Sequence, residues 1–396
     1  MRRVGTSALI GSKRRMMAHT VSEEANVASL SPEERAALRD SVSRLLADHS
    51  TEADVRRTME TETGYDAALW RKLAEMGVVG LVVDEAYGGA GAGPMELEAV
   101  MEEAGAALLC SPLLASGVLA AGLLQALGDT AACERLAPGI ASGERIATVA
   151  LTGPDGLWTR ESVAVKASGA ADAWSLAGVA DYVLHGQNAD VLLVLAQTTD
   201  GLAVFEVDPK AAGVAVSALP TFDHTLRLAR IEFEGASGRR LPAAGDVWAA
   251  VEEAMDLALV ALAGEQAGAA RRCLEFTVDY AKSRIQFGRA IGSFQAIKHM
   301  ASDLLLESES AISAARNAAA RLAEGEADAD EAISLAAFAC AEAFSRMTAD
   351  SVQMHGGIAF TWAHPAHLYL RRARADAQLF GAPAVWRERY LQALGA

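Results

Sequence analysis

The sequence predicts an α+β multidomain protein with an N-terminal all-α domain, a middle antiparallel β domain and a C-terminal four-helix bundle. Two observations carry this prediction. Apolar residues follow a helical period at first, change to the period of two that is typical of strands, and then return to a helical period. Strands and helices do not alternate in the middle part, which disfavours a doubly wound nucleotide-binding sheet. We therefore expect four parts, which are residues 1–30, 31–145, 146–245 and 246–396.

The composition is that of a globular protein. The chain has 396 residues and a hydrophobic content of 52%, so it can bury the cores of two or three domains. Its net charge of -16 argues against a nucleic-acid partner or an anionic membrane surface, since both favour basic patches. Four scattered cysteines form no Cys-x-x-Cys pair, which indicates buried thiols in a reducing cytoplasm. They are Cys110, Cys133, Cys273 and Cys340.

The first part, residues 1–30, is expected to be a disordered basic extension. Its basic residues are not accompanied by any acid before residue 20. The apolar stretch between them is too short and broken for a secretory signal. A start codon placed upstream of Met16 or Met17 would explain such an extension.

Helix signals fill the second part. Ser31 is a good N-cap residue, and Pro32 and two acids follow it in the first turn. A second helix is expected over residues 65–76, ending at Gly77. The uncharged stretch 108–127 is long enough to span a membrane. It contains a proline and several polar residues and has no flanking basic cluster, which favours a buried helix in a soluble domain.

The third part contains six short runs that are rich in β-branched and apolar residues and separated by turn clusters. These runs are residues 147–152, 163–167, 174–178, 191–196, 203–207 and 230–234. They predict the antiparallel β domain. The fourth part has long alanine-rich helical segments joined by short turns, which predicts a bundle. These segments are residues 247–285, 292–324, 329–357 and 365–395.

Two segments of the fourth part carry residue types that suit a dinucleotide. The first, residues 283–295, interrupts a long helix with an Arg-x-x-Phe-Gly turn; the second, about sixty residues later, reads Gln353-Met-His-Gly-Gly. A guanidinium can pair with a pyrophosphate, an aromatic ring can lie beside a flat cofactor, and glycines allow a dinucleotide to approach the backbone closely. Either segment alone is a weak signal, but the two together favour a flavoprotein.

With these segments, nearly the whole chain after residue 30 resembles the flavin-dependent acyl-CoA dehydrogenase family. In that family the two segments clasp FAD across a subunit boundary, one from each of two neighbouring chains, so the resemblance implies FAD and an oligomer. The FAD-binding positions that it implies are Arg284, Phe287, Gly288, Gln295, Gln353, Gly356 and Gly357. The alternative interpretation is a charge at a helix end for the arginine and a helix terminator for the last two glycines.

The resemblance also extends to the β domain, where the family contributes a Thr-Glu-Pro loop to the flavin ring and the thioester. This chain has Thr152-Gly153-Pro154, with glycine in place of the acid. The resemblance still implies that Thr152 approaches the flavin.

The reaction that the resemblance implies needs a carboxylate to remove the α proton of an acyl-CoA thioester while the flavin accepts hydride. Most relatives carry this base at the position of Gly381, and a minority carry it at the position of Ala258, so both usual places lack an acid here. Glu265 lies two helical turns beyond Ala258 on the same face and is the remaining candidate. A polar contact at a subunit interface or with the cofactor is the alternative for Glu265.

Three histidines in the last part, His355, His364 and His367, could suggest a metal. No cysteine or carboxylate completes a ligand set around them in the sequence. We therefore expect them on helix surfaces and expect no metal site.

Three functions are compatible with these observations. The missing base and the Phe-Gly-Ala-Pro stretch resemble the actinobacterial branch whose dehydrogenases combine two different subunits, several of them acting on CoA thioesters of sterol side chains. This resemblance implies one subunit of a heteromeric enzyme with an electron-transferring flavoprotein as acceptor. The second function is a self-sufficient homo-oligomeric dehydrogenase that uses Glu265, and the third is a catalytically silent protein that binds CoA esters or partner chains. The expected assembly is a homo- or hetero-tetramer.

Overall fold

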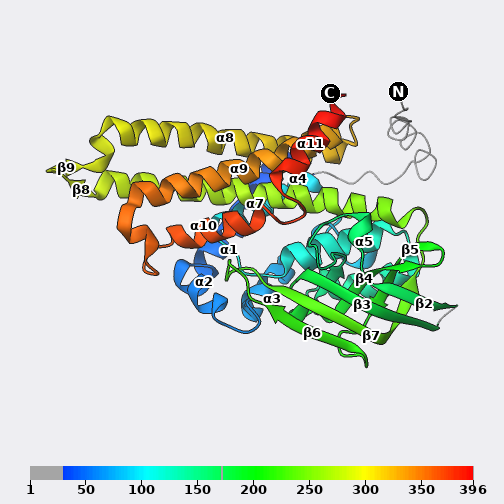
Figure 1. The fold of residues 1–396 in the computed structure, drawn as a ribbon. Coiled ribbons are helices and arrows are strands. Elements are labelled where there is room, and N and C mark those ends of the chain that lie inside the picture. The colour runs from blue at the N-terminus through cyan, green and yellow to red at the C-terminus, as the bar shows by residue number, and fades with distance from the viewer. Residues whose placement is uncertain (1–29, 171–172, 396) are drawn as a thin grey trace, which may run out of the picture.

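The structure is a computed structural model that describes residues 30–170 and 173–395. The expected basic extension therefore lies outside the described residues except for Leu30. Long helices of the C-terminal part run side by side, and the strands gather into a separate unit against one end of them (Figure 1). The chain forms helices first, then strands and then helices again, which is the predicted order.

The N-terminal helices begin where the sequence signals predict. The Ser31 hydroxyl accepts a hydrogen bond from the Glu34 amide at 3.2 Å, and the Glu34 carboxylate accepts one from the Ser31 amide at 2.9 Å, so a capping box starts the first helix. The helices are α1 (Pro32–His49), α2 (Glu52–Met59), α3 (Ala67–Glu75), α4 (Pro94–Ala106), α5 (Ala121–Ala126) and α6 (Thr130–Ala141), with a short 3-10 turn η1 (Glu85–Tyr87) and a π-helix η2 (Leu114–Ala120). The uncharged stretch 108–127 falls on η2 and α5 and is almost wholly buried. Within the described residues no helix is both long and apolar enough to cross a membrane.

The strands form one sheet that closes on itself. They are β1 (Ala147–Ala150), β2 (Lys166–Ala170), β3 (Ala173–Leu184), β4 (Val191–Thr198), β5 (Gly201–Val207), β6 (Val214–Leu219) and β7 (Leu228–Leu241). Hydrogen bonds connect β4, β2, β3, β7 and β5 in turn, and β5 pairs with β4 again. The β2–β4 pairing rests on one residue pair, Lys166 and Gln197.

The β unit differs from the prediction in two ways. The pairings of β1 and β2 with β4 are parallel, so the sheet is mixed rather than antiparallel throughout. The strand β6 was not predicted, because it is an edge strand made of small and apolar residues with no fully buried position. Its only partner among the described strands is β7.

The C-terminal part packs its helices along α7, which is 37 residues long. The elements are α7 (Val247–Ser283), β8 (Ile285–Gln286), β9 (Arg289–Ala290), η5 (Ile291–Ser293), α8 (Gln295–Glu324), α9 (Ala329–His355), η6 (Gly356–Phe360), α10 (Ala366–Asp376) and α11 (Pro383–Ala393). The helices α4 and α7 cross closely, because a Cβ added at Gly268 would lie 1.7 Å from the Glu102 carbonyl oxygen. The predicted helix over 365–395 is in fact two helices, since Phe380 and Gly381 have positive φ angles of 60° and 124°.

Buried acidic side chains of α4 face basic side chains of the helices around it. Glu98 and Glu102 lie one helical turn apart and are 2% and 1% exposed. Arginines of three other helices surround them, and Glu102 pairs with Arg39 at 3.1 Å and with Arg316 at 2.9 Å. The nearest guanidinium to Glu98 is that of Arg39, at 3.8 Å, and one Glu98 oxygen has no hydrogen-bond partner within the described part of the chain. Burial, with the neighbouring Glu102 second, raises the pKa of Glu98 to about 7.

We expect Glu98→Gln to stabilise the protein in alkaline but not in acidic solution. A carboxyl whose pKa is raised by folding does not destabilise the protein when the pH is below the ordinary pKa of the group. The destabilisation grows as the pH rises toward 7 and is complete above pH 7. Glutamine resembles the protonated acid, so the free energy of unfolding should rise by about 1–3 kcal/mol at pH 8 and change little at pH 4. Urea denaturation at both pH values measures this. The exposed Glu309→Gln on α8 is the control, and an equal effect of both variants would refute the expectation.

Candidate functional site

The Arg-x-x-Phe-Gly turn is a two-stranded hairpin that projects from one end of the bundle (Figure 1). Phe287 and Gly288 form its tip, with φ angles of 53° and 75°. The Phe287 side chain is 92% exposed. A large apolar ring held in an uncommon backbone conformation and open to solvent is suited to contact another molecule. Arg284 precedes the hairpin, is exposed, and forms no ion pair with any acid of the described chain.

The second segment ends α9. Gly356 has a φ angle of 65°, which any residue with a Cβ adopts only with strain. No atom lies within 4 Å of a Cβ added at Gly356 or Gly357, so the surface beside these glycines is open. Gln353 is exposed one turn earlier, and Gln295 is exposed at the start of α8. The backbone here is therefore accessible to a ligand, as a dinucleotide clasp requires.

The structure brings both segments to the same end of one chain. Tyr280, near the end of α7, stacks on His355, the last residue of α9, with ring centroids 4.4 Å apart and planes 28° apart. The resemblance implies a clasp that takes one segment from each of two neighbouring chains, and this assignment stays a prediction. His355 is also not on a helix surface as expected, because only 4% of it is exposed. Among the described residues, no group of three or more His, Cys, Asp or Glu side chains could hold a metal ion.

The usual position of the base, Gly381, lies in the break between α10 and α11. A Cβ added there would lie 3.3 Å from the Trp386 indole nitrogen, which itself donates a hydrogen bond to the Gly381 carbonyl oxygen at 3.0 Å. The cavity beside Gly381 has a volume of only about 10 Å³. The other usual position, Ala258, is completely buried in α7. The space beside Gly381 is too small for a thioester.

Two aromatic rings fill the space next to Gly381. Trp158 comes from the loop after β1, and Phe380 comes from the loop between α10 and α11. Their ring centroids are 4.8 Å apart at an interplanar angle of 71°, which is an edge-to-face contact. Phe380 is 1% exposed. The β unit and the helical bundle therefore meet here through packed side chains.

Glu265 is buried in an ion pair instead of facing an open pocket. Its carboxylate pairs with the Arg372 guanidinium, which also donates to the Asp223 carboxylate at 2.8 Å and to the Thr225 hydroxyl at 2.7 Å. The adjacent cavity has a volume of only about 30 Å³. A carboxylate held in this way is not free to accept a proton from a substrate, so the ion pair within the chain disfavours the role of base. The alternative of a polar contact at a subunit interface or with the cofactor stays a prediction.

The sequence analysis missed the rest of this cluster. Arg372 and Asp376 lie on α10, and Asp223 lies in the loop between β6 and β7. Burial, followed by the charge of Glu265, raises the pKa of Asp376 well above its usual range, which favours the protonated carboxyl. One signal was available in the sequence: Arg372 lies four residues after Leu368, so a charge shares the apolar face of this helix.

Thr152 faces the interior of the β unit. It is 1% exposed, and its hydroxyl donates a hydrogen bond to the Asp181 carbonyl oxygen. This hydroxyl could donate a hydrogen bond to a flavin only by exchanging that bond, whereas it could still accept one.

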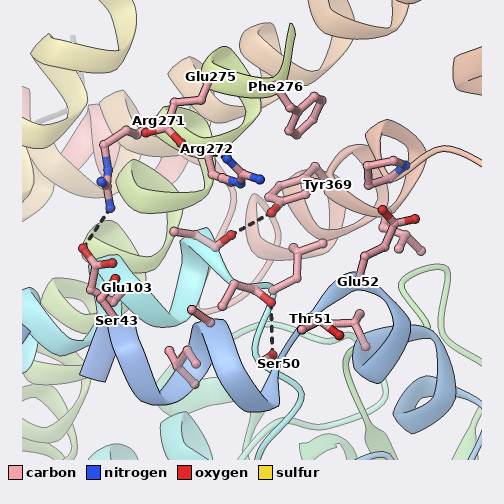
Figure 2. Close-up of a pocket in the computed structure, with 18 residues that line it drawn as sticks. Ser43, Ser50, Thr51, Glu52, Glu103, Arg271, Arg272, Glu275, Phe276 and Tyr369 are labelled. Carbon is pink, nitrogen blue, oxygen red and sulfur yellow. Dashed lines mark hydrogen bonds and ion pairs between the residues drawn. The ribbon is translucent and has the colours of Figure 1, made fainter. Parts of the chain in front are cut away.

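A separate cavity of about 550 Å³ lies between α1, α2, α4, α7 and α10. Figure 2 shows Arg271 directed toward Glu103 across its edge, and the Tyr369 hydroxyl bonded to the end of α4. This size would suit a small molecule. At its edge Arg271 pairs with Glu103 and Arg272 pairs with Glu275. Phe276 lines this cavity, and the centroid of its ring lies 5.7 Å from that of the His355 ring.

Comparison with known families covers most of the chain. Residues 32–144 match the family described as acyl-CoA dehydrogenase, N-terminal domain, and residues 245–395 match acyl-CoA dehydrogenase, C-terminal domain. Acyl-CoA dehydrogenase IpdE2 of Mycobacterium tuberculosis is 38% identical over 354 residues, which covers 89% of this chain and 94% of the relative. Acyl-CoA dehydrogenase FadE27 of the same organism is 34% identical, with 83% of this chain and 86% of the relative covered.

Solved structures of other proteins are also similar to this chain. The ChsE4-ChsE5 complex from Mycobacterium tuberculosis contains a chain that is 32% identical, with a TM-score of 0.84 and coverage of 92% of this chain and 98% of that chain. The Tcur3481-Tcur3483 steroid ACAD G363A variant is 29% identical with a TM-score of 0.81 and the same coverage.

Proposed function

Because the chain belongs to the acyl-CoA dehydrogenase family of oxidoreductases, we propose that it acts as one subunit of a heteromeric enzyme that dehydrogenates an acyl-CoA thioester. FAD is the cofactor of this family, and it supplies the hydride acceptor when bound. In this proposal the present chain helps to hold the cofactor, and a related partner subunit supplies the base and the thioester pocket.

The closed space around Gly381 is the observation that carries this proposal. No carboxylate stands at that position, a Cβ there would make a tight contact with the Trp386 indole, and the neighbouring cavity of about 10 Å³ is smaller than a thioester. Trp158 and Phe380 fill the adjoining space between the β unit and the bundle. The Glu265 carboxylate, the remaining candidate base, is paired with Arg372. These contacts favour the heteromeric subunit over the self-sufficient enzyme.

The exposed segments at the other end of the bundle fit the pyrophosphate side of FAD. Arg284 would pair with the pyrophosphate, and the open backbone at Gly356 and Gly357 would let it approach. Phe287 offers an aromatic ring on a protruding turn. The amides that would donate or accept hydrogen bonds at this surface are Gln295 and Gln353. Thr152 would donate a hydrogen bond to the flavin ring only after its hydroxyl gave up the bond to the Asp181 carbonyl oxygen.

The similarity to one chain of the ChsE4-ChsE5 complex and to the steroid ACAD Tcur3481-Tcur3483 supports a two-subunit assembly and a sterol-type acyl group. We further propose a hetero-tetramer in the cytoplasm with an electron-transferring flavoprotein as acceptor. A catalytically silent protein that binds CoA esters is the second candidate, because the same closed space would also be expected of it.

The test is a flavin spectrum of the chain purified alone and of the chain co-expressed with a related subunit that has glutamate at the position of Gly381. Both samples are then mixed with acyl-CoA esters from short-chain to steroid. The proposal expects the flavin band to bleach only in the co-expressed sample. Bleaching in the chain alone would support the self-sufficient enzyme, and a co-expressed complex whose flavin never bleaches would support the silent protein.

Arg284→Gln is expected to weaken FAD binding of the co-expressed complex by about tenfold to a hundredfold, because a charge-assisted hydrogen bond contributes about 1.5–3 kcal/mol. FAD titration followed by flavin fluorescence measures the affinity. Lys282→Gln is the matched control, since Lys282 is an exposed cation two residues earlier that pairs with Asp279 at 3.7 Å. Equal losses in both variants would mean that Arg284 acts only through the general charge of this surface.

A further inference from the structure

A stack of rings joins the two candidate cofactor segments. Tyr280 lies four residues before Arg284, and its hydroxyl donates a hydrogen bond to the His355 carbonyl oxygen at 3.4 Å, in addition to the ring contact. The His364 ring lies 4.4 Å from the His355 ring on the loop that follows η6. The end of α7, the end of α9 and the loop before α10 therefore meet at this one stack, directly below the hairpin and beside Gly356.

Hydrogen bonds indicate which tautomer each histidine of the cluster adopts when its ring is neutral. His355 Nδ1 donates to the Ser351 carbonyl oxygen at 2.8 Å, which leaves Nε2 without a proton. His367 Nδ1 donates to the His364 carbonyl oxygen at 2.7 Å, which also leaves its Nε2 without a proton. His364 Nδ1 accepts a bond from the Ala366 amide at 3.2 Å, so its proton is on Nε2. Both unprotonated Nε2 atoms are buried and have no partner among the described residues.

We propose that the rings of Tyr280, His355 and His364 position the Arg284–Gln295 segment against the Gln353–Gly357 segment, and that acid opens this stack and weakens binding of the dinucleotide cofactor. The inference rests on the proposed function, because it concerns how the candidate FAD segments are held. His355 is here a positioning residue, since its own ring is buried beneath the surface that would face the cofactor.

The surroundings explain why the stack requires neutral rings. A second proton on His355 would place a buried cation among the rings of Tyr280, Phe276 and His364, and no acid of the described residues forms an ion pair with His355. Ser351 contacts His355 through its hydroxyl and its carbonyl oxygen, and the same hydroxyl is bonded to that of Thr277. Charges reach the cluster only around His364 and His367, where the acid is Glu52 of α2 and the cations are Arg56 and Arg371.

The sign of the pH effect follows from burial. Burial lowers the pKa of His355, and it is also the first cause of the lowered pKa of His364 and of His367. A base with a lowered pKa in the folded state stabilises that state fully above its ordinary value near 6.5, and the stabilisation is lost as the pH falls below that value. The stack should therefore be closed at pH 7.5 and open progressively below pH 6.5.

The experiment measures FAD affinity and hydrogen exchange of the 352–357 amides from pH 7.5 to pH 5.5, using the full chain in its co-expressed complex. His355→Asn keeps a donor near Nδ1 and cannot take a proton, whereas His355→Ala loses both the donor and the ring. His49→Asn is the control, because the His49 ring contacts Lys72 and no ring of the stack. We expect the wild type and the His49 variant to lose affinity about tenfold between these pH values, and exchange of the segment to accelerate in parallel.

His355→Asn should bind FAD with little change over this pH range, and His355→Ala should bind weakly throughout. A wild-type pH profile in His355→Asn would overturn the inference, as would wild-type exchange rates that do not depend on pH after correction for intrinsic exchange. If exchange follows the expected profile while no form binds FAD at any pH, the positioning role stands and the proposed function fails. If FAD binds equally at all pH values, the proposed function stands and the inference fails.

Discussion

Arg372→Met is expected to lower the free energy of unfolding by about 3–5 kcal/mol, because it leaves buried carboxylates without their common partner. Arg372 is 4% exposed and pairs with Glu265 on α7 and with Asp223 of the β unit. Asp376, whose pKa burial raises, lies beside them and carries no positive charge that could replace the lost one. The change therefore removes the only ion pairs that join the β unit, α7 and α10 at this cluster of described residues.

Urea denaturation at pH 7 measures this effect. Arg374→Met is the control, because Arg374 is exposed on the same helix two residues later, and it should change stability by less than about 0.5 kcal/mol. The triple variant Arg372→Met, Glu265→Gln, Asp223→Asn should recover much of the loss, since the uncompensated charges are then gone. A small loss in Arg372→Met, or no recovery in the triple variant, would contradict the role of this cluster.

The sequence predicts elements well where local signals decide them. The capping box at Ser31 and Glu34 determines the start of α1, and alternating apolar residues mark most strands. The prediction fails where a distant contact decides. The helix expected over 365–395 breaks at Phe380 and Gly381, where the ring of Phe380 packs against Trp158 of another part of the chain. Helical periodicity alone does not include that contact.

In the candidate site, too, local sequence patterns predict some residues, whereas others depend on distant contacts. Sequence motifs located Arg284 and Gly356, but their common position in one chain depends on the contact between Tyr280 and His355, which are 75 residues apart. The sequence also identified Glu265 as an unusual acid in an apolar helix. Its partner Arg372 lies 107 residues later, and no local pattern connects the two. An acid that looks like a candidate base in the sequence is therefore an ion-pair partner in the fold.

Phe380→Ala is expected to lower the free energy of unfolding by about 3–5 kcal/mol, because a fully buried ring is replaced by a cavity. Phe380 is 1% exposed and contacts Trp158 edge to face. Phe360→Ala is the control, since Phe360 is 80% exposed and should lose less than about 0.5 kcal/mol. Urea denaturation measures both variants, and Trp158 should also become more accessible to a soluble fluorescence quencher in Phe380→Ala.

The same variant tests whether Phe380 and Trp158 only fill space or line a substrate pocket. If Phe380 and Trp158 only fill space, the enlarged cavity still lacks a carboxylate at Gly381, so the isolated Phe380→Ala chain should not dehydrogenate any acyl-CoA ester. Activity of the isolated variant would mean that an acid elsewhere, such as Glu265, reaches the opened space, and it would favour the self-sufficient enzyme. If the co-expressed complex with Phe380→Ala keeps its activity but unfolds at a lower temperature, the working pocket lies in the partner subunit. The cavity in this chain would then have changed the stability and left the reaction intact.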